Sequence, residues 1–233
     1  MLNDKWKESL ISVLRLTIIL FYYYVIFSSY IPNFVYELQQ KAGIYTNGTI
    51  RIEYQVIAYI LGLVPIIILI WPLIKKEKKL DFKKIIITFM FLMILAIFMN
   101  SAFSLFISLI NDGEFINSNN QNGLNELMQQ NMILHHFMII VLSPCLEELV
   151  FRGAIFRSLR AHSNFWISTF ISSILFGLIH VSSSLILGNW LDFTYLILYT
   201  GLGLLFCCTY EYNKNVLACI LMHMLYNACT LII

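Results

Sequence analysis

Seven apolar stretches of about 20 residues each limit what this chain can fold into more than any other feature of its sequence. A helix of that length crosses the hydrocarbon core of a bilayer, and in lipid a helix satisfies its own backbone hydrogen bonds where an open strand does not. We therefore predict an all-α fold, a polytopic bundle of about seven transmembrane helices (six to eight). The stretches lie at about 9–31, 53–74, 85–110, 131–151, 165–187, 193–210 and 215–233.

The composition excludes soluble classes of protein. Hydrophobic residues make up 59% of the chain and charged residues 12%, whereas a soluble domain is roughly 45–50% apolar and about 25% charged. A formal net charge of +2 is also too small for the basic surface of a nucleic-acid binder. We therefore predict an integral membrane protein that has the lipid bilayer as a partner and binds no nucleic acid. The sequence predicts no oligomeric state.

The basic residues predict the orientation in the membrane. With the N-terminus in the cytoplasm, the outer loops hold only Lys41 and Arg51, whereas twelve basic residues fall on the inner side. Such an excess is typical of cytoplasmic segments, so we expect an N-in, C-out topology. The frequent Lys, Asn and Ile suggest an AT-rich bacterial genome, and hence a bacterial cell membrane. The inner residues are Lys5, Lys7, Lys75, Lys76, Lys78, Lys79, Lys83, Lys84, Arg152, Arg157, Arg160 and Lys214.

The chain divides near residue 130. Residues 1–130 are predicted to hold three spans and a polar outer loop, 111–131, which contains no Lys or Arg. Residues 131–233 are predicted to hold the remaining spans and the polar side chains that suggest chemistry. The five cysteines lie in or beside apolar segments and form no CxxC pair, so they are expected to be small buried side chains instead of disulfide or metal sites.

Two adjacent glutamates, Glu147 and Glu148, lie near the cytoplasmic end of the fourth span. A charged residue at the centre of a membrane helix costs at least about 2.5–3.5 kcal/mol, so it needs a partner or a function. Glu148 and Arg152 are four residues apart and share a helix face, which favours an ion pair. Glu147 is rotated about 100° from Glu148 and has no such partner. Pro144, one turn earlier, can open the backbone ladder to polar groups.

Polar residues in two later spans also suggest a site. Phe176 and His180 share one helix face, and Gly177 beside them permits the close approach of another helix. His223 and Asn227 share a face of the last span. Each feature has an ordinary structural explanation: a snorkelled Glu–Arg pair, or a His or Asn that joins neighbouring helices. Their coincidence in the C-terminal half favours a shared functional site.

These motifs resemble those of the CPBP family, the CAAX protease and bacteriocin-processing group also called Abi proteins. The family includes the type II CAAX prenyl endopeptidases. The resemblance covers about residues 140–230, and the first three spans carry no signature. The matching motifs, in chain order, are Glu-Glu-x-x-x-Arg (Glu147, Glu148, Arg152), Phe-x-x-x-His (Phe176, His180) and His-x-x-x-Asn (His223, Asn227).

The resemblance implies an intramembrane glutamic endopeptidase that uses no metal or other cofactor. Glu147 would be the general base, and His180 would help it to hold and activate the hydrolytic water. His223 and Asn227 would stabilise the oxyanion of the tetrahedral intermediate. Prenylated CAAX proteins, or peptides in maturation or bacteriocin self-immunity, are the substrates that the family suggests. The supporting residues implied by the same motifs are Glu148, Arg152 and Phe176.

The chemistry makes two further demands on the fold. Hydrolysis needs water, and a polar cavity that opens toward the cytoplasm would admit it. Glu147 lies shallow in the predicted fourth span, whereas His180 lies about 20 Å along the fifth. For the two to meet, the fifth helix must tilt, start later or begin outside the core. An interfacial helix at Gly153–Ser163 would permit this.

Two other functions fit the same residues. The first is a membrane scaffold or immunity protein that keeps the fold but catalyses nothing. The second is a zinc-dependent hydrolase in which Glu147, His180 and His223 hold the metal, a ligand set that zinc accepts.

Overall fold

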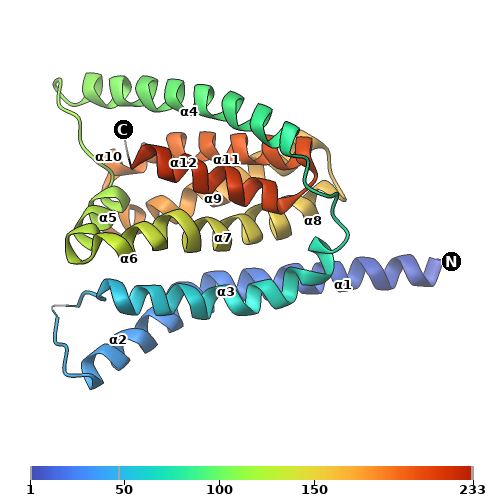
Figure 1. Cartoon of the computed structure of the whole chain (residues 1–233), viewed down its shortest axis with the longest axis horizontal. Helices are drawn as coiled ribbons and strands as arrows, with labels where there is room; N and C mark the ends of the chain where they lie inside the picture. The colour runs from blue at the N-terminus through green and yellow to red at the C-terminus, as the bar shows by residue number, and fades with distance from the viewer. Residues whose placement is uncertain (1, 47, 232–233) are drawn as a thin grey trace.

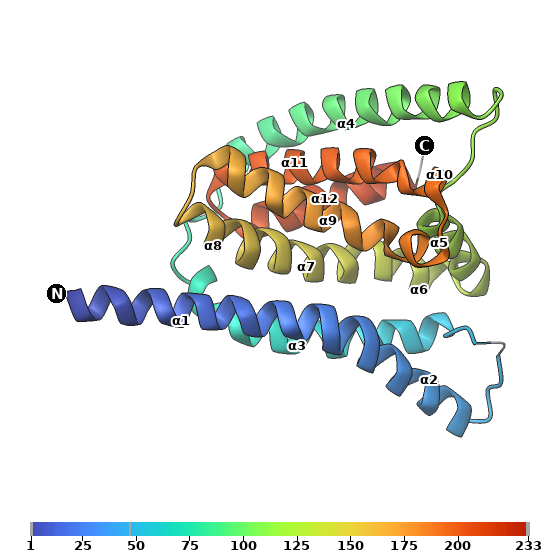
Figure 2. The same ribbon diagram turned by 180° about the vertical axis from the view of Figure 1, so that it is seen from behind.

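The computed structural model describes residues 2–46 and 48–231, and side-chain burial for all of these except 2–10, 183, 186 and 187. Every regular element in the described residues is a helix, so the all-α prediction is confirmed. Figures 1 and 2 show the long helices lying roughly along one common axis, in layers.

The first layer is a pair of long antiparallel helical runs, drawn at the bottom of Figure 1. Tyr22 ties the two runs together, because its hydroxyl donates to the carbonyl of Leu61 at 2.8 Å. The connection between the runs is held by Gln39, which accepts from the backbone N–H of Arg51 at 2.8 Å. The elements are α1 (Leu2–Phe21), the π-helical η1 (Tyr22–Tyr30) and α2 (Ile31–Lys41) in one run, and α3 (Ile52–Ile74) in the other.

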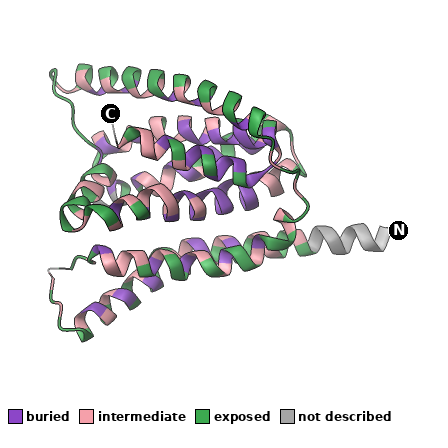
Figure 3. Ribbon diagram, in the orientation of Figure 1, coloured by how far each residue is buried: buried purple, intermediate pink, exposed green. Residues whose placement is uncertain are grey.

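α4 (Phe82–Ile110) covers the opposite side of the bundle. It starts at Asp81, whose side chain accepts from the backbone N–H groups of Lys83 and Lys84 at 3.1 and 3.2 Å, as an N-cap residue does. Its outer face carries large exposed apolar side chains such as Phe91 and Phe98. Figure 3 shows this helix mostly exposed, which suits a face turned to lipid.

A short helix occupies most of the segment predicted as a polar outer loop. α5 (Asn119–Gln130) starts at Ser118, whose side chain accepts from the backbone N–H of Gln121 at 3.1 Å. Its first N–H, on Asn119, donates to the buried carboxylate of Asp192 at 2.6 Å. A carboxylate at a helix N-terminus is stabilised by the helix dipole, so a buried acid anchors α5 to the end of the bundle.

The C-terminal half forms the core between these two layers, where Figure 3 shows most of the buried residues. One continuous helical run crosses it first, and three further long helices pack around that run. The run consists of α6 (Met132–Phe137), η2 (Met138–Leu142), α7 (Ser143–Glu148), η3 (Leu149–Phe156) and α8 (Arg157–Arg160). It is followed by α9 (Phe165–Leu187), the short α10 (Trp190–Phe193), α11 (Tyr195–Asn213) and α12 (Val216–Thr230).

Five helices of the described chain are long and apolar enough to cross a membrane. The remaining two predicted spans correspond to the run 132–160, which the π-helical segments interrupt, and to α12, which has 15 residues. A bundle of about seven spans therefore accounts for all the long helices. The five are Ile11–Lys41, Ile52–Ile74, Phe82–Ile110, Phe165–Ser182 and Trp190–Asn213.

The fourth span does not end where the sequence predicted. Residues 153–160 continue the helical run to Arg160 and do not form a separate interfacial helix. Gly153 allows this, because a Cβ there would meet the side chain of Ile70 at 2.7 Å, so the run packs directly on α3. Arg157 is neutralised within the bundle by Glu77, at 2.9 Å. The helix therefore continues through Arg157 to Arg160, although these charges had suggested a helix at the membrane interface.

This extension removes the predicted mismatch in depth between Glu147 and His180. Glu147 lies about 20 Å from the end of its run at Arg160, and His180 lies about 22 Å from the start of α9 at Phe165. The two helices are antiparallel neighbours joined by a short turn. The side chains therefore reach the same level, and no special tilt is needed.

Two glycines let α9 and α11 approach closely, as the sequence predicted for Gly177. A Cβ on Gly177 would lie 3.1 Å from the backbone nitrogen of Thr200, and one on Gly203 would lie 2.9 Å from the Cα of Ser173. Backbone atoms cannot move aside as flexible side chains do. This contact fixes the spacing of the two helices that flank the polar residues.

We predict that Gly203→Ala lowers the free energy of unfolding by about 1–3 kcal/mol, the usual cost of overpacking. The control is Gly123→Ala on α5, where an added Cβ meets nothing within 4 Å. That change should stabilise by about 0.5–1 kcal/mol, since alanine is the better helix former. Thermal unfolding of both variants in detergent measures the difference, and equal stability would contradict the packing described.

Candidate active site

The backbone around the glutamates is π-helical on both sides. In η2 the N–H of Ser143 donates to the carbonyl of Met138, five residues earlier. The next bond of that pattern would join Pro144 to Ile139, but proline has no N–H to donate. The side-chain amide of Asn227 donates to the free Ile139 carbonyl instead, at 3.0 Å. Pro144 thus opens the ladder, as predicted, and the opening holds Asn227 in place.

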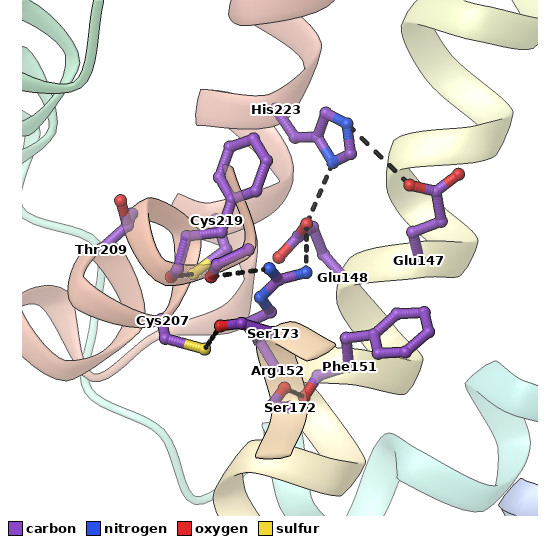
Figure 4. A network of polar contacts seen from close by, with 12 residues as sticks. Glu147, Glu148, Phe151, Arg152, Ser172, Ser173, Cys207, Thr209, Cys219 and His223 are labelled. Carbon is purple, nitrogen blue, oxygen red and sulfur yellow. Dashed lines mark hydrogen bonds and ion pairs between the residues drawn. The ribbon is translucent and has the colours of Figure 1, made fainter. Parts of the chain in front are cut away.

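Glu148 is the centre of a buried polar network (Figure 4). Its Oε1 accepts from Arg152 Nη1 at 3.0 Å, within the ion pair predicted from their spacing. The same oxygen lies 2.9 Å from His223 Nδ1. Neither Glu148 nor Arg152 has any exposed surface. The Glu148 carboxylate is therefore bound by a cation and an imidazole, and it is shielded from any substrate.

The Arg152 guanidinium is also held from its other sides. Nη2 donates to the carbonyl of Gly203 at 3.0 Å. The guanidinium carbon lies 4.6 Å from the ring centroid of Phe176 and 5.2 Å from that of Phe206. Contacts between a desolvated cation and aromatic faces are worth about 2 kcal/mol. Phe176, placed by the sequence in a supporting position, packs on this charge.

Glu147 lies in a different environment from its neighbour. Ser143, one turn earlier, donates a hydrogen bond to its Oε1. Its Oε2 lies 3.9 Å from His223 Nε2, beyond direct hydrogen-bond distance. The side chain keeps some exposure, whereas that of Glu148 has none. One oxygen of Glu147 is thus fixed by a hydroxyl, and the other remains available.

His180 faces the same space from α9. Its ring packs 4.7 Å from the centroid of Phe176 and 4.5 Å from that of Tyr199. Among the described side chains no hydrogen bond joins His180 to Glu147. Both instead line one cavity, so they face a common volume without contact.

A cavity of about 1050 Å³ lies among η1, α3, α4, α5, η2, α7, α9, α11 and α12. Its volume is at the upper limit of typical small-molecule pockets, which hold about 300–1,000 Å³. Glu147, His180, His223 and Asn227 all line it. Glu148 and Arg152 do not line it, and they lie behind His223 and Phe176.

The cavity reaches the surface at one particular end of the bundle. Exposed Gln121 and Ser182 line it there, as do Asn117 and Asn125 of the α5 region. In Figure 1 this end carries α5, α10 and the C-terminus, and the lysine-rich connection between α3 and α4 lies at the other end. If the N-terminus is cytoplasmic, the cavity therefore opens to the outside. The expected cytoplasmic opening is incompatible with the expected orientation.

The structure brings together all seven residues that the sequence singled out, five on the cavity wall, Phe176 among them, and two, Glu148 and Arg152, behind it. It also adds residues that the sequence reasoning missed. Ser143 is four residues before Glu147, and this helical spacing could have identified it. Tyr199 packs on His180 and accepts from Asn120 at 3.3 Å, and no local pattern reveals it. No group of three or more His, Cys, Asp or Glu side chains in the searched part of the chain is arranged to hold a metal ion.

Residues 129–229 match the family model described as type II CAAX prenyl endopeptidase Rce1-like, which confirms the family resemblance over that part of the chain. Over 93 residues the chain is 37% identical to YdiL of Bacillus subtilis, named as a membrane peptidase; the match covers 39% of the chain and 34% of the relative. Over 97 residues it is 32% identical to the membrane-embedded CAAX protease MroQ of Staphylococcus aureus, with 39% and 35% covered. The matched part thus spans about a third of each relative. No solved structure matches the chain significantly.

The polar network predicts a large difference between two glutamate variants. Glu148→Ala leaves the Arg152 charge buried without its carboxylate and should lower the free energy of unfolding by about 3–5 kcal/mol. Glu53→Ala removes a surface partner of Arg51 and should cost about 0–1 kcal/mol. Unfolding in detergent measures both.

A second variant separates the charge effect from general damage. Adding Arg152→Met to Glu148→Ala removes the unpaired charge and should recover part of the lost stability. A double variant that is less stable than Glu148→Ala alone would contradict the ion pair as the cause.

The orientation can be tested at the C-terminus, because Thr230 and Leu231 line the cavity and lie at its open end. Under the N-in prediction, alkaline phosphatase fused to the C-terminus should be active, since it folds outside the cell. The same enzyme fused after Lys79 should be inactive, since the basic connection stays inside. The reverse pattern would mean that the cavity opens to the cytoplasm.

Proposed function

We propose that the Rce1-like part of this chain, residues 129–229, is the catalytic core of an intramembrane endopeptidase. Glu147 would activate a water molecule that hydrolyses a peptide bond in a membrane-associated peptide or protein. One observation carries this proposal above the others. Of two adjacent glutamates, Glu148 is bound by Arg152 and His223, and Glu147 presents a carboxylate oxygen to the cavity.

The geometry supports separate roles for Ser143, Glu147 and His180 around the water. The Ser143 hydroxyl fixes one Glu147 oxygen, so the other can accept a proton from water. His180 lines the same cavity and can hold the same water through a ring nitrogen. A positioned carboxylate base contributes typically 10²–10⁴-fold to such a reaction. Glu147 would then pass the proton to the leaving amine nitrogen.

Two side chains can serve the oxyanion of the tetrahedral intermediate. Asn227 uses one N–H on the Ile139 carbonyl and keeps a second one, because an amide has two donors. His223 contacts Glu148 through Nδ1, which leaves Nε2 toward Glu147 and the cavity. When both ring nitrogens of His223 carry a proton, Nδ1 donates to Glu148 and Nε2 can donate to the oxyanion. Donors held in advance around a developing charge are a large source of catalysis.

The names of the relatives bear on the substrate. One is called a CAAX protease and the other a membrane peptidase, so both a prenylated CAAX protein and an unmodified peptide remain candidates. In a bacterium, the cleavage would serve peptide maturation or self-immunity. The enzyme is proposed to act in a bacterial cell membrane.

Two alternatives remain to be tested. A scaffold or immunity protein without catalysis would use the same fold, and the intact set of motif residues argues against it. A zinc hydrolase would need Glu147, His180 and His223 to converge on one point. In the part of the chain that the structure describes, these three side chains do not form a cluster that could hold a metal ion, which argues against the zinc mechanism.

We predict that Glu147→Gln abolishes turnover, with a fall of at least about 10²-fold, because the amide cannot take a proton from water. The measurement is a comparison of peptides from cells that express the native chain or the variant. Glu37→Gln, on the exposed side of α2, is the matched control and should leave the peptide pattern unchanged. Full biological activity of Glu147→Gln at normal expression would support the scaffold instead.

A chelator arm of the same experiment tests the zinc alternative. Cleavage by the purified chain should persist after exhaustive metal removal and should still depend on Glu147. Loss of cleavage on chelation, restored by zinc, would establish the metal-dependent mechanism in its place.

A further inference from the structure

A second pocket lies at the end of the bundle opposite the mouth of the large cavity. Its volume is about 330 Å³, and none of the described residues lines both pockets. In Figure 1 this end carries α8 and the connection between α3 and α4. That connection, the end of the helical run 132–160 and the junction of α11 with α12 all contribute to it. The lining residues are Lys76, Glu77, Lys78, Arg157, Tyr210 and Lys214.

The second pocket is strongly basic. Four of its six lining residues are Lys or Arg, and one is an acid, Glu77. Together, residues 75–84, 157–162 and 211–215 hold nine Lys or Arg residues and three Asp or Glu residues. An excess of six positive charges at one end of the bundle attracts anions, and a concave site among these charges concentrates the field.

Glu77 does not neutralise the lysines, because its carboxylate already accepts three hydrogen bonds. Oε1 accepts from Arg157 Nη1 at 2.9 Å and from the Tyr210 hydroxyl at 2.8 Å. Oε2 accepts from the backbone N–H of Val216, the first residue of α12, at 2.8 Å. The Glu77 side chain is only 3% exposed. It therefore joins the helices behind the pocket and leaves the outer charges without a counterion.

The basic side chains keep donors for an anion. Among the described contacts Arg157 donates from Nη1 alone, to Glu77 and to the Leu73 carbonyl at 3.0 Å. A guanidinium has five N–H groups, so others remain. Lys76 and Lys78 are exposed, and neither forms an ion pair with a described carboxylate. These three side chains can bind one anion together.

The segment that carries the two lysines is attached to the turn between α11 and α12. The N–H of Lys78 donates to the Lys214 carbonyl at 3.4 Å, and the Lys78 carbonyl accepts from the side chain of Asn215 at 2.6 Å. Lys214 lines the pocket from this turn and also pairs with Glu211 at 2.6 Å. Membrane orientation depends on the number of basic residues in a loop and does not require such an attachment. The attachment therefore indicates a binding site.

The position of the pocket at the membrane surface indicates a lipid as the source of the anion. Exposed Trp71 lies in the last turn of α3 and exposed Trp166 in the first turn of α9, at the same end of the bundle. Tryptophans at span ends lie at the level of the lipid headgroups. The Lys75 ammonium lies 5.4 Å from the centroid of the Trp71 ring, at that level. Exposed apolar side chains at the helix ends, such as Leu217 of α12, can contact the acyl chains.

We propose that this pocket binds the phosphate of an anionic phospholipid, with Lys76, Lys78 and Arg157 as the main ligands. Basic pockets between membrane helices are suited to such headgroups. The site lies outside the catalytic cavity, goes beyond the proposed endopeptidase function and does not depend on it. Because the pocket joins the α3–α4 connection to the start of α12, a bound lipid stabilises the folded chain.

The test uses the full chain in a neutral detergent at about 0.15 M salt, where charges more than about 8 Å apart are screened. The anionic probe is dioleoylphosphatidylglycerol, and the probe without net charge is dioleoylphosphatidylcholine. Native mass spectrometry counts the bound lipids, and thermal unfolding measures stability. We expect one phosphatidylglycerol to bind at least about tenfold more tightly than phosphatidylcholine and to raise the Tm. Equal binding of the two lipids would overturn the proposal.

Two double variants remove the same charge from the same connection. Lys76→Gln with Lys78→Gln should weaken phosphatidylglycerol binding about 30-fold, since each basic residue at a headgroup contributes about fivefold. Lys79→Gln with Lys83→Gln removes two exposed lysines that do not line the pocket, and it should weaken binding less than about threefold. Without lipid both variants should unfold at the native Tm, because all four side chains are exposed. An equal loss of binding in the two would mean a diffuse basic surface and overturn the site.

Glycerol phosphate separates a lipid from a free anion, because it offers a phosphate without acyl chains. At the concentration that saturates the chain with phosphatidylglycerol, it should neither raise the Tm nor displace the lipid. If glycerol phosphate stabilised the native chain as much as the lipid did, and if Lys76→Gln with Lys78→Gln removed this effect, the pocket would belong to a soluble phosphate compound. That result would overturn the lipid assignment.

Discussion

The Arg152 guanidinium is buried in a bundle that lipid surrounds, and a charge in that position must be neutralised by its neighbours. Glu148 supplies the carboxylate, Gly203 a carbonyl, and Phe176 and Phe206 two aromatic faces. These partners come from α7, α9 and α11, and His223 adds α12 through Glu148. One charge therefore ties together four helical runs. Because Glu148 is committed to this task, its neighbour Glu147 is left to face the cavity.

A missing backbone donor, at Pro144, also ties α12 to the helical run that carries the glutamates. The helix is already widened into a π-turn at this point, and Pro144 has no N–H to donate to the Ile139 carbonyl. The side-chain amide of Asn227, on α12, donates to that carbonyl instead. π-helical segments are frequent at functional sites, since they displace side chains that an α-helix would stack. The Glu148–Arg152 ion pair holds one side of the helical run 132–160, and the Asn227 hydrogen bond beside Pro144 holds another. The available carboxylate, the imidazoles and the free amide N–H are held between them.

Local spacing in the sequence was enough to predict the Glu148–Arg152 pair, the close approach at Gly177 and the spans themselves, because each depends on residues within one or two helical turns. The extension of the fourth helix to Arg160 was not predictable in that way. It depends on Glu77, which reaches Arg157 from a connection far away in the chain. The direction of the cavity also depends on how distant helices meet, as does the contact of Tyr199 with His180. The division of the chain at residue 130 stays a prediction.

In the proposed mechanism, substrate binds against Glu147 and away from Glu148. A crystal structure of the Glu147→Gln variant, grown in a lipid phase with an uncleaved peptide, tests this most directly. We expect an extended peptide in the cavity, with the scissile carbonyl carbon about 3–3.5 Å from a water held between residue 147 and His180. The carbonyl oxygen should face His223 and Asn227. A peptide bound outside the cavity, or with its scissile carbonyl far from residue 147, would contradict the account.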